Sequence, residues 1–365
     1  MNWTDRRFLD LAGIDLPIIQ APMAGSVTSE MVIAVSEAGG LGSLPCAMLS
    51  RDQMRAELGI IRQRTSRPIN VNFFCHREPA TDTNRDATWR KKLAAYYREL
   101  GLDPDAPVPA ANRAPFDDAA CEVVEEFTPE VVSFHFGLPE SRLLDRVRMT
   151  GAKVLSSATT VDEARWLAEH GCDAIIAQGY EAGGHRGLFL SDDISTQAGT
   201  MALVPQVVDA VHVPVIAAGG IADGRGVVAA FALGAAAVQV GTAFLFCPEA
   251  KISPMHREAL RAAKDNGTVL TNVFTGRPAR GLVNRVVREV GPLSDAAPAF
   301  PLAATAMSPL RTAAEASGSG DFSPLWSGQA AALGRDRSAG ELTRWIADDA
   351  QAQLGHLSGS GRANG

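Results

Sequence analysis

The sequence lacks the patterns that mark several classes of protein. It has no CxxC or HExxH spacing, so we expect no structural or catalytic metal. Its basic residues form no dense run and its net charge is −7, so we expect no nucleic-acid partner. The cysteines are odd in number and far apart, which argues against a disulfide framework and favours a reducing, cytoplasmic compartment. They are Cys46, Cys75, Cys121, Cys172 and Cys247.

Signals for secretion or membrane insertion are also scarce. The N-terminal segment has no apolar signal core. Residues 227–248 are uncharged and long enough to cross a bilayer. They also contain Gly234, Gln239 and Gly241, and they divide naturally into a helix followed by a strand. We therefore expect neither a membrane span nor a membrane partner.

What the sequence does contain is a repeated alternation of short apolar runs with helical patterns. The runs cover residues 16–22, 41–44, 68–74, 131–137, 153–157, 173–177, 213–220 and 236–240. Eight strands alternating with helices predict an α/β fold, specifically a (β/α)8 TIM barrel. A doubly wound sheet is the rival fold, but no GxGxxG motif follows the first run.

The regular alternation is interrupted once and then ends. Residues 75–115 are polar and proline-rich around one helical patch, which predicts an insertion after the third strand. We expect residues 1–252 to form the barrel, and residues 253–322 to form a helical cap over its mouth. Residues 323–365 are expected to return to the barrel and end in a flexible tail.

In such a barrel the active site lies at the C-terminal ends of the strands, and unusual residues collect there. They are Met23, Asn72, His135, Gln178, Gly219, Gly220 and Gly241. The Gly219–Gly220 and Gly241–Thr242 turns follow the last two strands, where barrels commonly bind phosphate through bare backbone N–H groups. Asn72, Gln178 and Gln239 offer amides for the pyrimidine edge of a flavin, and Pro22 and Met23 offer apolar contacts for its other end. We therefore predict an FMN site.

The seven histidines divide by position. His185 lies in a glycine-rich turn after the sixth strand and is the candidate base, because imidazole exchanges protons near neutral pH. His135 ends the fourth strand and is a secondary pocket residue, while His76, at the edge of the insertion, is undecided. The remaining four are expected at the surface: His170, His212, His256 and His356.

These residues lie within motifs that resemble the nitronate monooxygenases, formerly called 2-nitropropane dioxygenases, and most closely their bacterial first class. The matching stretches are Ile19-Gln-Ala-Pro-Met-Ala-Gly, Val71-Asn-Phe-Phe-Cys-His, Val132-Ser-Phe-His-Phe-Gly-Leu-Pro, Gln178-Gly-Tyr-Glu-Ala-Gly-Gly-His-Arg-Gly, Ala217-Ala-Gly-Gly-Ile-Ala-Asp-Gly, Gln239-Val-Gly-Thr and Leu325-Trp-Ser-Gly-Gln.

The resemblance implies an FMN-dependent enzyme that uses O2 to oxidise alkyl nitronates, such as propionate 3-nitronate. The products would be a carbonyl compound and nitrite or related nitrogen oxides. His185 would deprotonate a neutral nitroalkane or orient the nitronate, and the substrate pocket would include His135, Met23 and Phe73. Carried over by position, the FMN contacts would be Asn72, Gln178, Gly183, Gly220, Gln239, Val240, Gly241 and Thr242. Pro22, Met23 and Gly219 complete the predicted FMN site on the physical grounds given above.

Two alternatives remain open at this point. One is an FMN-dependent reductase that moves hydride from NAD(P)H to an enoyl thioester or quinone; the other is a barrel that binds flavin without turnover. The sequence also departs from the family's pattern, since Phe300 stands where a pocket tyrosine is expected. Neither the physiological nitronate nor the oligomeric state follows from the sequence.

Overall fold

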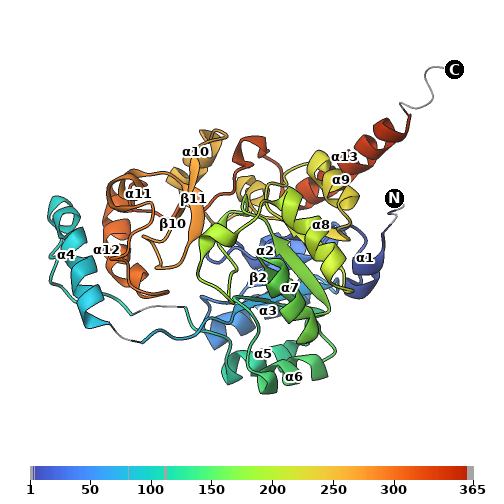
Figure 1. Ribbon diagram of the computed structural model, residues 1–365, viewed down its shortest axis with the longest axis horizontal. Helices are drawn as coiled ribbons and strands as arrows, with labels where there is room; N and C mark the ends of the chain where they lie inside the picture. The colour runs from blue at the N-terminus through green and yellow to red at the C-terminus, as the bar shows by residue number, and fades with distance from the viewer. Residues whose placement is uncertain (1–2, 4, 81, 111–112, 360–365) are drawn as a thin grey trace.

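The computed structural model describes residues 3, 5–80, 82–110 and 113–359, and in them a parallel barrel is the central element (Figure 1). The sheet has the strand order β1-β9-β8-β6-β5-β4-β3-β2. It closes where Gln20 N donates to Leu41 O at 3.0 Å and Leu41 N donates to Ile18 O at 2.9 Å. The predicted (β/α)8 barrel is confirmed. Its strands are β1 Ile18–Gln20, β2 Gly42–Pro45, β3 Ile69–Phe74, β4 Val131–His135, β5 Lys153–Ala158, β6 Ala174–Gln178, β8 Val215–Ala218 and β9 Ala237–Val240.

Helices surround the barrel in the alternating order that the sequence predicts. The C-terminal helix α13 packs against α9 and α2 and so takes the eighth place in the ring (Figure 1). A short helix, α1 (Arg7–Ala12), precedes the first strand. The surrounding helices are α2 Ser29–Glu37, α3 Arg51–Arg64, α5 Asp118–Phe127, α6 Ser141–Met149, α7 Val161–Glu169, α8 Thr200–Ala210, α9 Gly224–Ala232 and α13 Ala339–Gly359. Short 3-10 turns are η1 Ile194–Thr196, η2 Thr242–Phe246 and η3 Ala331–Leu333.

Side-chain caps fix where two of these helices begin. The side chain of Asp223 accepts from Arg225 N, as its position before α9 predicts. Thr160 accepts from Glu163 N at the start of α7. The Glu163 carboxylate does not complete a capping box, because it accepts instead from Thr159 N and from the backbone of Phe189. It thereby ties the loop after His185 to the barrel wall.

The uncharged stretch 227–248 divides as the sequence predicts, into the end of α9, strand β9 and turn η2. Its side chains belong largely to the barrel core, where Val227, Val238 and Val240 are fully buried. None of the described helices is long and apolar enough to cross a membrane.

The segment 253–322 is not purely helical, so that expectation was wrong in part. It contains α10 (Pro254–Arg261), α11 (Arg285–Val290) and α12 (Ala303–Ala316), together with the hairpin strands β10 (Thr268–Thr271) and β11 (Ala279–Leu282). Strand β11 also pairs with β7 (Gly184–His185), a two-residue strand in the loop that follows β6. The cap and the glycine-rich loop therefore share one small antiparallel sheet.

The insertion packs on this cap. Its helix α4 (Thr83–Glu99) lies with α11 and α12 on the side of the molecule away from α13 (Figure 1). Trp89 Nε1 donates to Ala303 O at 3.3 Å, and Tyr97 Oη donates to Ala306 O at 2.6 Å. Because these polar groups are paired inside a second apolar cluster, the insertion and the cap form one layer beside the barrel.

The C-terminal helix is longer than expected. The sequence predicts a frayed tail after Gly355, whereas α13 continues to Gly359. The remainder of the predicted tail, residues 360–365, lies outside the described residues.

Candidate active site

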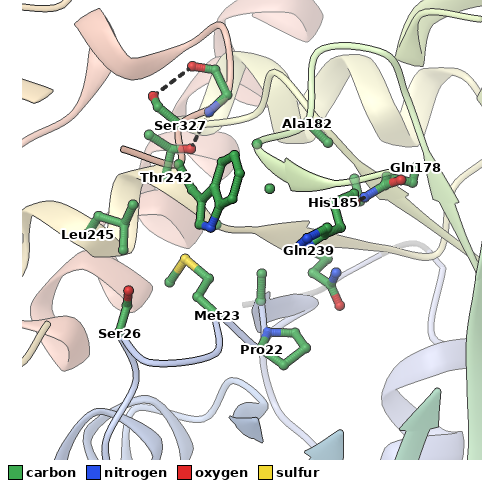
Figure 2. Close-up of a pocket in the computed structure, with 18 of the residues that line it drawn as sticks. Pro22, Met23, Ser26, Gln178, Ala182, His185, Gln239, Thr242, Leu245 and Ser327 are labelled. Carbon is green, nitrogen blue, oxygen red and sulfur yellow. Dashed lines mark hydrogen bonds between the residues drawn. The ribbon is translucent and has the colours of Figure 1, made fainter. Parts of the chain in front are cut away.

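A cavity lies at the carboxyl ends of the barrel strands, and the predicted site residues meet there (Figure 2). Pro22 and Met23 lie on one side of it, and Thr242 and Ser327 lie on the opposite side (Figure 2). The predicted residues that line it are Pro22, Met23, Asn72, His135, Gln178, Gly183, His185, Gly219, Gly220, Gln239, Gly241 and Thr242.

Two predicted residues do not line the cavity, and strand geometry explains both. Phe73 points into the core, where its ring lies 4.7 Å from that of Phe116, while the next residue, Phe74, lines the cavity. Successive side chains of a strand face opposite sides, so a motif match that is one residue off places the wrong phenylalanine in the pocket. For the same reason Val240 is fully buried, whereas its neighbour Gln239 reaches the cavity.

The loop after β6 is held from behind by a buried arginine. Arg186 is completely buried, and its guanidinium donates to the carbonyl oxygens of Gln178 (2.8 Å) and Gly179 (2.7 Å) and to Gln197 Oε1 (2.9 Å). Burial lowers its pKa to about 10, so it remains charged at neutral pH. Because three neutral acceptors satisfy this cation, it fixes the backbone on which the loop turns.

Gln178 acts on the same loop rather than presenting a free amide. Its Nε2 donates to the carbonyl oxygen of His185 (2.9 Å), and its Oε1 accepts from Gly187 N (2.8 Å). The side chain still lines the cavity, but both ends of its amide hold the turn that carries His185.

His135 supports the same carbonyl from the other side. Its Nε2 donates to His185 O at 3.3 Å, which places the ring proton on Nε2 and leaves Nδ1 to accept from Ser157 Oγ at 3.0 Å. Burial, aided by the positive charge of Arg277, lowers the pKa of His135 to about 3. It is therefore a neutral residue whose two nitrogens are both occupied, which suits positioning better than proton transfer.

His185 itself is positioned by the cap. Residue by residue, β7 pairs with β11, so His185 lies opposite Ala279 and Gly184 opposite Arg280. The His185 ring contacts Thr275 through Nε2, which lies 2.9 Å from Thr275 Oγ1. Among the described residues no group is hydrogen bonded to its Nδ1, so one ring nitrogen remains available.

The surroundings of His185 favour negative charge. Burial lowers its pKa well below 6.5, and Arg113, His135, Arg277 and His76 add to the effect. Arg113 lines the cavity and forms no ion pair with a described residue. A neutral imidazole near the Arg113 guanidinium suits an anionic ligand or an anion that forms during reaction.

The glycine positions leave backbone exposed to the cavity. Gly219 and Gly220 have φ values of +120° and +72°, which a side chain adopts only with strain. Gly183 has a different role, since a Cβ there would lie 2.5 Å from Gly328 N. It permits the segment 325–330 to pack against the loop and complete the cavity wall.

That segment joins three parts of the molecule. Gly328 N donates to Thr242 Oγ1 at 2.8 Å, Gln329 N donates to Glu181 O at 3.0 Å, and Leu282 N of the cap donates to Leu325 O at 2.8 Å. Thr242 therefore supports the wall through its hydroxyl, in addition to lining the cavity (Figure 2).

A flavin fits two features of this cavity. Gln239 lines the cavity, and its Oε1 atom is buried without a hydrogen-bond partner in the described residues, so this acceptor has unused bonding capacity. Asn72 donates its Nδ2 to Ser133, while its side chain still lines the cavity. Apolar neighbours at Pro22, Met23 and Leu245 supply the rest of the wall.

Several residues near the cavity were not predicted to lie there. His256 was expected at the surface, but it is buried, lines the cavity and donates from Nε2 to Trp326 O at 3.0 Å. Trp326 and Arg113 also line it. His76 is buried outside the cavity, with its ring 4.8 Å from that of Phe300, and Phe300 lies 5.3 Å from the His185 ring. The match at Leu325-Trp-Ser-Gly-Gln contains Trp326 and the match at Val71-Asn-Phe-Phe-Cys-His contains His76, but no matching stretch contains Arg113 or His256.

TIM-barrel enzymes have their active sites at the C-terminal ends of the strands, and this cavity, with its neutral histidine near arginines, lies there. The fold and the site are therefore those of a TIM-barrel enzyme. The model of the nitronate monooxygenase family matches residues 6–349. The chain is 42% identical to the nitronate monooxygenase of Pseudomonas aeruginosa over 349 residues, which are 94% of this chain and 98% of that protein. It therefore belongs to the nitronate monooxygenase family, a family of oxidoreductases.

Two solved structures are similar over nearly the whole chain. A nitroalkane oxidase from Streptomyces ansochromogenes is similar with a TM-score of 0.87 and 38% identity, covering 96% of this chain and 99% of that one. FabK from Thermotoga maritima is similar with a TM-score of 0.76 and 30% identity, covering 98% of this chain and all of that one.

Proposed function

We propose that this protein uses FMN and O2 to oxidise alkyl nitronates to a carbonyl compound and nitrite or related nitrogen oxides. The observation that carries the proposal is the positive charge near His185 in a largely apolar cavity. Arg113 lines this cavity, and burial together with the charges of Arg113 and Arg277 lowers the pKa of His185. An alkyl nitronate is an anion with an apolar chain, and the cavity offers that combination of positive charge and apolar wall.

FMN is the cofactor that the residues fit best. We propose that Gly219, Gly220 and Gly241 admit its phosphate, and that Gln239 and Asn72 pair with the pyrimidine edge of its ring. One phosphate site without a dinucleotide fingerprint favours FMN over FAD. When bound, FMN supplies the electron-accepting and oxygen-reacting chemistry that the side chains of the cavity lack.

The protein's own residues then have distinct roles. Arg113 and Arg277 raise the local concentration of an anionic substrate and stabilise its charge. With a neutral nitroalkane, His185 takes the α-proton on a ring nitrogen, and the electron pair of the broken C–H bond moves into the nitro group to give the nitronate. With a preformed nitronate, the same ring orients the substrate. His135, Gln178 and Arg186 keep the loop in place.

Anaerobic mixing with a nitronate tests the proposal most directly. Purified protein reconstituted with FMN should lose the absorbance of oxidised flavin on mixing, regain it when O2 is admitted, and release nitrite under aerobic turnover. Protein that binds no FMN, or bound flavin that a nitronate leaves unchanged, contradicts the proposal.

Because the chain is similar to FabK, the same experiment should also test the reductase alternative. An NAD(P)H-dependent reductase would bleach its flavin with NAD(P)H in the absence of O2 and reoxidise it with an enoyl thioester or quinone. A barrel that only binds flavin would respond to neither reagent.

A further inference from the structure

We propose that Thr275 is a positioning residue: its hydroxyl holds the His185 ring so that Nε2 carries the proton and Nδ1 is the nitrogen offered to substrate. This inference rests on the proposed function and assigns the orientation of the base to the cap. Thr275 lies in the turn between β10 and β11, it is 2% exposed, and it does not line the cavity. It therefore touches the histidine from behind and acts through it.

The geometry fixes which nitrogen is engaged. His185 Nε2 lies 2.9 Å from Thr275 Oγ1, within ordinary hydrogen-bond distance. The hydroxyl has a further acceptor within reach, the carbonyl oxygen of Arg277 at 3.5 Å. If Nε2–H donates to Oγ1, the hydroxyl proton is free to point at that carbonyl. Every donor and acceptor in this series of hydrogen bonds then has a partner. The opposite arrangement places the hydroxyl proton on Nε2 and leaves the Arg277 carbonyl without it.

The backbone arrangement makes this contact part of the cap rather than of the barrel. Strand β11 pairs with β7, and Arg186 N donates to Pro278 O at 2.9 Å. The end of the turn that carries Thr275 and the strand that follows it are thus attached to the backbone on both sides of His185. A ring held at its backbone and at Nε2 has little freedom to rotate, which keeps Nδ1 directed away from the cap.

The chemical consequence concerns the proton-transfer step. When the α-proton of a nitroalkane moves to Nδ1, the C–H electron pair becomes the nitronate and His185 becomes an imidazolium. Its Nε2–H continues to donate to Thr275 Oγ1, so no second proton has to move. With a preformed nitronate this step is absent, and the orientation of the ring matters less.

Matched valine and serine variants test the assignment. Thr275→Val keeps the shape but removes the hydroxyl, and should lower kcat/KM for neutral nitroalkanes about fivefold to tenfold, the effect of one lost hydrogen bond. Turnover of the preformed nitronate should change less than about twofold, and Thr275→Ser should restore the nitroalkane rate. Thr271→Val is the control, because that buried hydroxyl donates to Pro292 O and does not contact His185. It should affect both substrates alike.

Nitrogen NMR of the imidazole tests the same point without turnover. In FMN-saturated wild-type protein labelled with ¹⁵N-histidine, the His185 signals, assigned by their loss in His185→Asn, should show a protonated Nε2 and an unprotonated Nδ1. Thr275→Val should move the Nε2 signal and Thr271→Val should not. A protonated Nδ1 in the wild type, or equal losses on both substrates in Thr275→Val, overturns the inference. Wild-type protein that oxidises neither substrate contradicts the proposed function instead, and the NMR result still decides the role of Thr275.

Discussion

His185 is the proposed base, and it has one ring nitrogen without a hydrogen-bond partner in the described residues and a pKa lowered first by burial. If it is the base, His185→Asn should slow oxidation of neutral nitroalkanes by about 10²–10⁴-fold, the usual contribution of positioned proton transfer. The preformed nitronate has already lost that proton, so its oxidation should slow much less. Steady-state rates of FMN-saturated enzyme, measured before the two substrates interconvert, give the comparison.

His212→Asn is a suitable control for that experiment, since His212 is exposed and lies outside the cavity. It should leave both rates unchanged. Equal losses on the two substrates in His185→Asn would remove the base assignment. His135 would not replace it readily, because both of its ring nitrogens are already hydrogen bonded.

For single residues, the sequence predicts which positions lie at the cavity better than it predicts which atoms each side chain contacts. Glycines and a histidine that follow strands mark the C-terminal rim of a barrel, and twelve of the predicted site residues meet there. Phe73 and Val240 do not line the cavity, whereas their neighbours Phe74 and Gln239 do, because a motif does not reveal which face of a strand a side chain occupies. His256 was missed because its burial depends on the distant segment around Trp326.

At the scale of elements, the turns after β8 and β9 form the proposed phosphate site, and Gly241 offers the cleaner test. Its φ is −110°, and an added Cβ would meet only Ala21 Cβ at 3.5 Å and Met23 Sδ at 3.8 Å, so alanine fits the folded chain without strain. The methyl group would crowd the phosphate. We expect Gly241→Ala to weaken FMN binding about tenfold or more, as overpacking commonly does.

Gly220→Val should weaken FMN binding as well, but part of its effect would come from the backbone, since Gly220 has a φ of +72°. Gly59→Ala on α3 is the control, because nothing lies within 4 Å of the added Cβ. Fluorescence titration of FMN into the cofactor-free proteins measures the dissociation constants. A folded Gly241→Ala protein with unchanged FMN affinity would exclude this turn from the site.

The elements of the barrel could be predicted because each strand is a compact apolar run between helices, a local pattern. The small sheet of the cap could not, because β7 is two residues long and pairs with β11, which lies about a hundred residues further along the chain. Such strands exist only through their tertiary partners. The orientation of His185 depends on them, so the sequence located the histidine without showing what holds it.

At the scale of the whole molecule, the barrel, the insertion, the cap and the segment around Trp326 enclose four histidines in neutral form. Burial is the first cause in each case: it lowers the pKa of His76 to about 4, of His135 to about 3 and of His256 to about 4, and that of His185 well below 6.5. In the unfolded chain each would titrate near its ordinary value of about 6.5. Because these histidines are buried, the free energy of unfolding depends on pH.

The direction of that dependence follows from proton binding. Between pH 6.5 and about 4 the unfolded state binds protons that the folded state does not, so the free energy of unfolding falls as the pH falls. The stabilisation is fully present above pH 6.5. Within the window each such histidine lowers stability by up to about 1.4 kcal/mol per pH unit. Urea unfolding of FMN-free protein at several pH values between 7.5 and 4.5 should show this steep loss.

Single substitutions show whether the buried histidines are responsible. His256→Gln keeps a side-chain donor for Trp326 O and removes one titrating group, so the loss of stability per pH unit should become smaller by about one histidine's share. His212→Gln changes an exposed histidine in the same chain and should leave the slope as it is. The two variants are compared by slope rather than by stability at one pH, because a slope is insensitive to packing lost on substitution. If His256→Gln and wild-type protein lose stability equally from pH 6.5 to 5, His256 titrates alike in both states, and burial in the folded protein does not hold it neutral.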